Sequence, residues 1–421
     1  MYVCGVTVYD YCHLGHARAY VAFDIIRRHL EYRGYTVQHV QNFTDIDDKI
    51  IERAQKNNED VATLTARFEK AYSDDMQALN ILPAHGYPKA TASMPAIIAM
   101  IENLIARGHA YAAGGDVFFS ISSDDRYGQL SKRGRKQMEA GARIDVDTRK
   151  KDPLDFVLWK AQKPGEPAWE SPWGLGRPGW HIECSAMATT ELGSQIDIHG
   201  GGRDLIFPHH ENEIAQSECS TGLHPFVKYW LHNGFVTIDK QKMSKSLGNF
   251  FTLRDLLEKY APMTLRFFLL TTHYRHPINF SDQLLSETDG ALLKLRQTAH
   301  SHPSAAPAIL ETEFTTRFDA AMDDDFNTAE AIACLFDLSR EVNKAQAGGA
   351  LLKHLAERIG VTLHAPEVLT LDDTVEKLVA ERQAARASKN FALADEIRKQ
   401  LTDMGIALED TPQGLRWKKV S

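Results

Sequence analysis

The hydrophobic pattern of the first fifty residues predicts a strand, a helix and a second strand. Residues 1–11, MYVCGVTVYDY, are rich in β-branched and aromatic side chains, which is typical of a buried strand. Apolar side chains then recur at helical spacing: Ala19, Phe23, Ile26 and Leu30. Residues 36–48, TVQHVQNFTDIDD, indicate another strand. Strand–helix–strand units build parallel sheets, so the fold class is expected to be α/β.

The pattern changes twice before residue 180. Residues 50–111 are mainly helical in pattern, with an interruption at 82–88. Residues 114–124, GGDVFFSISSD, are strand-like, and 163–179 are rich in Pro, Gly and Trp, which is typical of a loop. We interpret 112–176 as an insertion in the first domain and expect the sheet to resume at Trp180.

The last third of the chain is helical in pattern and ends differently. Short Pro- and Ala-rich breaks near 303–308 and 364–366 separate the helical segments, which predicts a helical bundle. Residues 406–419, IALEDTPQGLRWKK, predict a small strand–turn–strand end.

Composition narrows the class of protein. The 421 residues are 43% hydrophobic and 25% charged, which describes a globular chain of about three domains. No apolar run reaches the ~18 residues of a membrane helix, and the start lacks a signal-peptide pattern. Five scattered cysteines favour reduced thiols and a cytoplasmic location. A net charge of −8 gives no general attraction to nucleic acid, although a local surface could still bind RNA.

Residues 177–213 hold the densest candidate chemistry. His209 and Glu213 stand four apart, so a helix would place them on one face, and Cys184 lies upstream. Sulfur, nitrogen and oxygen are all zinc ligands, but zinc needs four positions filled and only three are found here. The alternative is a solvated His–Glu pair, which is the commoner meaning of this spacing.

Two short motifs suggest phosphate binding. His13-Leu-Gly-His16 lies at the predicted strand-to-helix junction, where backbone N–H groups favour anions. Lys242-Met-Ser-Lys245-Ser-Leu-Gly-Asn supplies two lysines in a short loop that could hold a polyphosphate. Helix capping by the histidines and an ordinary exposed lysine loop are the alternatives.

Together these motifs resemble the two signatures of class I aminoacyl-tRNA synthetases, and their surroundings resemble cysteinyl-tRNA synthetases. The resemblance rests on MYVCGVTVYD, NFTDIDDKI, DFVLWK, GRPGWHIECSAM, DIHGGGRDLIFPHHENEIAQ and KMSKSLGNF, and extends to the closing PQGLRW. Members of that family carry a further segment, with an edge strand, before the MYVCG stretch. The resemblance implies five parts: a Rossmann-like catalytic domain at 1–111 and 177–235, a connective insertion at 112–176, a KMSKS-loop and stem-contact region at 236–285, a helical bundle at 286–366, and an anticodon-binding α+β domain at 367–421.

The resemblance also implies the roles of individual residues. It supplies Cys4 as a fourth zinc ligand beside Cys184, His209 and Glu213, while His210 is expected to point off their shared face. The substrate thiolate is expected to bind this zinc, because zinc prefers thiolate to hydroxyl. Cysteine-binding residues would be Gly5, Thr44 and Trp180, with Trp180 as a lid; core packing is the alternative for Trp180. ATP and its catalysis would involve the remaining residues: His13, Gly15, His16, Gly201, Lys242 and Lys245.

The implied reaction is activation of L-cysteine by ATP, with Mg²⁺, followed by transfer to tRNA(Cys) by a cytoplasmic monomer. One alternative is the cysteine ligase of mycothiol synthesis, which joins cysteine to an amino sugar and would not need an anticodon-binding end. A second is a non-catalytic, zinc-dependent RNA-binding or regulatory paralogue, against which the intact HLGH and KMSKS motifs argue.

Overall fold

The computed structural model describes residues 1–134, 147–238, 241–242, 251–365, 373–388, 390–404, 406–411 and 414–419. For residues 241–242, 373–376, 387 and 406–419 the description covers the backbone alone. The chain forms two compact units, Met1–His364 and Ala365–Ser421, and each is described by itself. Within the described residues, no helix has the length and apolar content needed to cross a bilayer.

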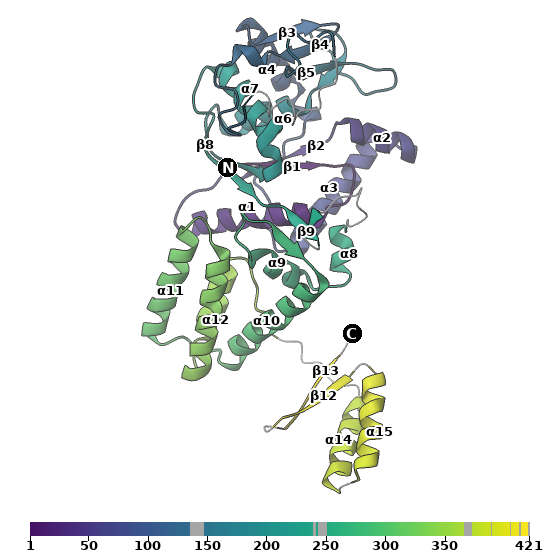
Figure 1. The fold of residues 1–421 in the computed structure, drawn as a ribbon, viewed down its shortest axis with the longest axis vertical. Coiled ribbons are helices and arrows are strands. Elements are labelled where there is room, and N and C mark those ends of the chain that lie inside the picture. The colour runs from purple at the N-terminus through teal and green to yellow at the C-terminus, as the bar shows by residue number, and fades with distance from the viewer. Residues whose placement is uncertain are drawn as a thin grey trace. The chain divides into compact units, whose positions relative to one another are not determined.

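A four-stranded parallel sheet organises the first unit (Figure 1). The strand order is β2-β1-β7-β8. Its strands are β1 (Tyr2–Thr7), β2 (Val40–Thr44), β7 (Ile196–Gly202) and β8 (Val227–Asn233). Every pairing is parallel, which confirms the α/β fold expected from the first fifty residues.

Helices cover both faces of this sheet. Helix α1 (Leu14–Tyr32) lies on one face and α6 (Trp180–Leu192) on the other (Figure 1). Helix α7 (Glu211–Thr221) packs beside α6. The prediction that the sheet resumes at Trp180 is therefore wrong, since it resumes at Ile196. Every side chain from Ile182 to Ala188 is buried, so α6 lacks the polar face that reveals a helix in sequence.

The insertion is an antiparallel sheet of its own. Its strands, in spatial order, are β3 (Ala110–Ala113), β4 (Asp116–Phe119), β5 (Phe156–Ala161) and β6 (Gly176–Pro178). It follows α2 (Asp48–Asn57), α3 (Val61–Ala78) and α4 (Met94–Ala106). A separate apolar cluster around the fully buried Trp159 joins this sheet to α4 and α6. The insertion thus shares a core with the helix that follows it.

After β8 the first unit becomes largely helical. A small sheet comes first, with strands β9 (Val236–Ile238), β10 (Gln241–Lys242) and β11 (Ile278–Phe280). The helices are α8 (Leu253–Leu257), α9 (Pro262–Leu270), α10 (Asp282–Ser301), α11 (Ala308–Asp323), α12 (Thr328–Ala345) and α13 (Gly349–Arg358). Buried Leu and Phe side chains from α9 to α13 continue the core of the parallel sheet, so the bundle and the sheet stabilise each other.

The second unit is a helical pair with a hairpin. Helices α14 (Asp373–Ala387) and α15 (Phe391–Asp403) pack together, and β12 (Ile406–Thr411) pairs antiparallel with β13 (Gly414–Lys419). The predicted strand–turn–strand end is confirmed.

Candidate active site

A cavity of about 470 Å³ lies at the carboxyl ends of β1 and β7. In open parallel sheets this edge is the usual place for ligands. The walls come from the β1–α1 loop, the start of α1, the glycines of β7 and residues 233–236. Seven sequence-predicted residues line it: Cys4, Gly5, His13, Gly15, His16, Trp180 and Gly201.

The two histidines of the HLGH motif cap helix α1 and also face this cavity. His13 Nδ1 accepts a hydrogen bond from the Gly15 N–H at 3.0 Å, and His16 Nδ1 accepts one from the His13 N–H at 3.2 Å. The rings stack with their centroids 3.8 Å apart. Because both Nδ1 atoms accept, the ring proton of each neutral imidazole is on Nε2. His13 and His16 can therefore cap α1 through Nδ1 and also offer an Nε2–H donor.

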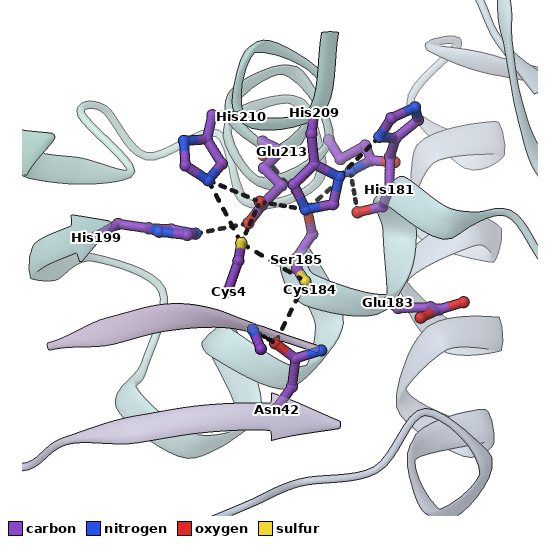
Figure 2. A network of polar contacts seen from close by, with 12 residues as sticks. Cys4, Asn42, His181, Glu183, Cys184, Ser185, His199, His209, His210 and Glu213 are labelled. Atoms are coloured by element: carbon purple, nitrogen blue, oxygen red, sulfur yellow. Dashed lines mark hydrogen bonds and ion pairs between the residues drawn. The ribbon is translucent and has the colours of Figure 1, made fainter. Parts of the chain in front are cut away.

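Cys4, Cys184, His209 and Glu213 come together beneath the cavity (Figure 2). Their ligand atoms all lie within 4.8 Å of one another, and all four residues are buried. The two Sγ atoms are 4.0 Å apart, and Glu213 Oε1 is 3.6 Å from Cys4 Sγ and 3.0 Å from His209 Nε2. Neighbouring ligands of a tetrahedral zinc are separated by roughly 3–4 Å, given bonds of ~2.0–2.3 Å. The donor set and its spacing fit zinc.

The charges of this cluster also call for a cation. Hydrogen bonding from Cys4 lowers the pKa of the Cys184 thiol to about 6 despite burial, whereas burial raises the pKa of Cys4. Burial alone would raise the pKa of Glu213, but His199 and His209 hold it well below its usual value. Burial opposes protonation of His209, yet Glu213 and Cys184 raise its pKa to about 10. Two buried anions thus face one imidazolium, an arrangement that a bound cation would stabilise.

A second ligand set overlaps the first, because His210 also reaches the cluster. Its Nε2 lies 3.3 Å from Cys4 Sγ, and Cys4, His199, His210 and Glu213 form another buried group. The expectation that His210 points away is wrong. The chain kinks at Phe207, whose backbone is extended, and His209 and His210 then stand four and three residues before Glu213, so both histidines meet that carboxylate.

Gly5 and Thr44 occupy different surroundings. Gly5 lines the cavity and approaches β2 so closely that a Cβ would lie 1.5 Å from the Asn42 carbonyl oxygen. Its N–H donates to Asn42 Oδ1 at 2.9 Å. Thr44 is buried and is not among the cavity-lining residues; its hydroxyl donates to Glu183 at 3.2 Å. Glu183 points away from the cysteine cluster in Figure 2.

Trp180 and Gly201 form part of the cavity wall. The Trp180 ring stacks on the His209 ring with centroids 4.4 Å apart, and 41% of the residue is exposed, which excludes simple core packing. A Cβ on Gly201 would lie 2.8 Å from Leu205 and 3.2 Å from His210. Glycine at this position therefore lets the strand lie against the histidine turn. Lys242 lies on β10, where the backbone alone is described, and Lys245 lies outside the described residues.

Several polar residues beside the cluster had no sequence motif to reveal them. His181 Nδ1 is 2.9 Å from His209 Nδ1, His199 Nε2 is 2.8 Å from Glu213 Oε2, and His232 Nε2 is 2.8 Å from His210 Nδ1. These imidazoles orient the cluster from outside. The density of histidines between 181 and 232 is the one sequence signal that could have indicated them.

Comparison with known proteins places this fold and site in a class. The model for the class I (C) catalytic domain of tRNA synthetases matches residues 1–290. A solved methionyl-tRNA synthetase of Mycobacterium tuberculosis, in complex with methionyl-adenylate, has the same fold at a TM-score of 0.62 and 16% identity. That match covers 85% of this chain and 89% of that one. The fold is therefore that of a class I aminoacyl-tRNA synthetase.

Sequence relatives then identify the family within the class. The cysteine–tRNA ligase of Alkalilimnicola ehrlichii is 53% identical over 100% of this chain and 95% of its own length. That of Halorhodospira halophila is 52% identical over 100% of this chain and 94% of its own length. A DALR-domain model matches residues 317–369, and the cysteinyl-tRNA ligase anticodon-binding model matches 370–417. This chain belongs to the cysteinyl-tRNA synthetase family.

Proposed function

We propose that this protein activates L-cysteine with ATP and Mg²⁺, then transfers it from cysteinyl-adenylate to the terminal ribose of tRNA(Cys). The observation that carries the proposal is the buried Cys4–Cys184–His209–Glu213 cluster at the base of a cavity lined by His13 and His16. The cluster would supply selectivity for a thiol, and the cavity wall at His13 and His16 would supply a place for a triphosphate. The anticodon-binding match at 370–417 supports tRNA rather than an amino sugar as the acceptor.

Cysteine would lie between the cluster and Trp180. Zinc held by Cys4, Cys184, His209 and Glu213 would bind the substrate thiolate in preference to the hydroxyl of serine, a difference that shape alone separates poorly. Gly5 lets β1 pack closely on Asn42 of β2, and its backbone in the cavity wall would contact the amino acid. Trp180 stacks on His209 and is positioned to cover the bound amino acid.

ATP would lie across the strand ends with its phosphates at the start of α1. The Nε2–H groups of His13 and His16 and the N-terminal N–H groups of the helix are donors for those phosphates. Gly15 would keep that approach open and Gly201 would lie on the adenosine side; both residues line the cavity. Lys242 and Lys245 would supply positive charge on the β- and γ-phosphates.

The chemistry requires positioning more than proton transfer. The cysteine carboxylate attacks the α-phosphorus and pyrophosphate leaves, so no general base is needed. Charge that develops on the phosphate oxygens is stabilised by His13, His16 and the lysines. All five cysteines are free thiols, which is consistent with action in the reducing cytoplasm.

The test combines cysteine-dependent ATP–pyrophosphate exchange with charging of total tRNA by labelled cysteine. We expect both activities, with serine failing in each, and one zinc per chain by elemental analysis. Exchange without charging, together with transfer to an amino sugar, would instead support the cysteine–amino-sugar ligase. Loss of both activities in a zinc-loaded protein would contradict the proposal.

A further inference from the structure

Helix α2 presents a basic face that begins at the mouth of the active-site cavity. Lys49, Arg53 and Lys56 stand at positions i, i+4 and i+7, so they share one side of the helix. The opposite side is buried through Ile50, Ile51 and Ala54. The spacing therefore directs three cations away from the core in a single row.

Two contacts fix the near end of this row against the HLGH loop. Lys49 lines the cavity, and its Nζ lies 5.6 Å from the centroid of the Tyr9 ring. An Arg53 terminal nitrogen lies 4.0 Å from Asp10 Oδ1, and Asp10 lines the cavity as well. Arg53 Nε is buried and has no hydrogen-bond partner among the described residues. The Arg53 side chain as a whole is 38% exposed, so its terminal nitrogens are the part that can reach a ligand at the mouth.

The acidic residues of α2 do not cancel this row. The Asp48 carboxylate is occupied by Lys160, at 2.9 Å, and by Arg177 of the insertion sheet. Asp47 caps the helix by accepting from the Lys49 N–H. Glu52 remains on the exposed side, displaced by about 60° around the helix from Lys49. Lys49, Arg53 and Lys56 thus place three cations in one row, with Asp10 beside Arg53, on a chain whose total charge is −8.

We propose that Lys49, Arg53 and Lys56 bind the phosphate backbone of the tRNA acceptor end and guide its terminal ribose into the cavity. The inference rests on the proposed function, because the cavity that forms the adenylate must also admit the nucleic acid. A row of three cations is about 10 Å long at 1.5 Å per residue, which matches roughly three phosphates at about 3.4 Å per phosphate along one stacked strand. Recognition of this kind is electrostatic and independent of sequence.

The test is the Arg53→Gln/Lys56→Gln double variant, which leaves Lys49 and the cavity intact. We expect unchanged kinetics of ATP–pyrophosphate exchange for both ATP and cysteine. KM for tRNA in charging should rise about 25-fold near 0.1 M salt, since each phosphate contact to a single strand is worth roughly fivefold there. The plot of log binding constant against log salt should become less steep by about 1.4.

Two single variants provide matched controls. Lys56→Arg keeps the charge and should retain wild-type KM for tRNA. Lys228→Gln removes an exposed lysine that lies on β8, ion-paired with Asp197, and should leave that KM unchanged. An equal effect of Lys228→Gln would show that overall charge, not this face, is responsible, and would overturn the inference.

Direct tRNA binding separates this inference from the proposed function. A wild-type protein that charges tRNA beside a double variant that binds it equally well overturns the inference alone. Suppose that the wild-type protein binds tRNA but does not charge it, and that the double variant binds tRNA more weakly. This result overturns the proposed function and supports the inference that this face of α2 binds tRNA. The double variant could also raise the KM for ATP in exchange as much as the KM for tRNA in charging. This result would mean that the face binds ATP, and it would overturn the inference.

Discussion

Two buried polar clusters of this protein are built in opposite ways. Arg266 on α9 is fully buried, and its five N–H groups all donate: to the Leu79, Asn80 and Ile359 carbonyls and to Asp24 of α1. Asp24 accepts further bonds from Arg28 and the Leu82 N–H. The Cys4–Cys184–His209–Glu213 cluster instead leaves two anions against one cation, and the neighbouring His199 Nδ1 has no partner among the described residues.

The difference separates a structural cluster from a binding site. A network whose donors and acceptors are all paired has nothing left to offer a ligand, and its role is to fix how α1 and α9 pack. A buried cluster with unbalanced charge is costly in isolation and becomes favourable when a partner of the right charge enters. Counting donors, acceptors and charges therefore distinguishes the two more reliably than burial, which is nearly complete in both.

The largest effect on activity is expected from removing a ligand of the unbalanced cluster. Cys184→Ser should abolish retained zinc and lower cysteine-dependent exchange by more than ~100-fold, because even residues that orient metal ligands are worth roughly 10–100-fold. The measurements are metal content and exchange at saturating ATP. Cys334→Ser, a buried cysteine of α12, is the control and should retain both. A Cys184→Ser variant with full zinc and full exchange would remove Cys184 from the ligand set.

Substitutions in the fully paired Arg266–Asp24 network should lower the stability of the fold and leave metal binding unchanged. Arg266→Met leaves Arg28 as the one remaining cation beside Asp24 and removes the side-chain donor of the Leu79 and Ile359 carbonyls, at a cost of about 3–5 kcal/mol in the free energy of unfolding. The double variant Asp24→Asn/Arg266→Met should recover part of that loss, because a neutral amide replaces a buried carboxylate that has only Arg28 left as a cation. Urea unfolding measures both, and folded protein should keep its zinc. Arg67→Met, which breaks an exposed pair with Glu59, should cost less than about 1 kcal/mol.

The smallest effect concerns Asp75, whose network is only half complete. Asp75 Oδ1 accepts from Arg254 at 3.1 Å, but Oδ2 is buried without a partner among the described residues. Burial outweighs Arg254 and raises the pKa of Asp75 from 3.8 to about 6. A carboxyl whose pKa is raised by folding binds its proton more tightly in the native state. Stability from this group therefore falls as pH rises from about 4 to about 6.

Replacing Asp75 tests whether this group lowers stability as pH rises. Asp75→Asn should flatten the fall of stability between pH 4 and 6 and raise stability at pH 7 by about 1 kcal/mol, since water screens the partly exposed Arg254. Thermal unfolding at a series of pH values measures it. Glu341→Gln, whose carboxylate pairs with Lys344 at the surface far from Asp75 in sequence, should leave the profile unchanged. A steeper profile in Asp75→Asn would mean that the ion pair outweighs burial.

The two clusters also differ in how far the sequence reveals them. Cys184, His209 and Glu213 attract attention because soft and hard metal ligands gather within a few dozen residues. Cys4 joins them only through the tertiary fold, since its Sγ meets Cys184 and Glu213 across 180 and 209 residues of sequence, and it was expected from the family resemblance alone. His210 was misjudged because residues three and four positions before Glu213 share its face of the helix, so His209 and His210 both reach the carboxylate.

The complete network had no sequence signature. Asp24 and Arg266 resemble any surface acid and base on an amphipathic helix, and the carbonyls that Arg266 binds belong to loops whose path depends on the tertiary fold. The N-terminal strand–helix–strand unit, in contrast, was predictable because its apolar spacing is local. Helix α6 was missed because burial on all sides removes that spacing.

Helix α1 joins the catalytic cavity to the helical bundle as one rigid rod. Its first residues carry the HLGH histidines, and near its other end His29 Nε2 lies 2.8 Å from Asp323 Oδ1 at the end of α11. Its 19 residues span about 28 Å. A tilt of about 3° at the bundle end would move His13 by roughly 1.5 Å, which is more than a hydrogen bond to phosphate tolerates. In mechanical terms, α1 is a lever arm through which the bundle sets the alignment of His13 and His16.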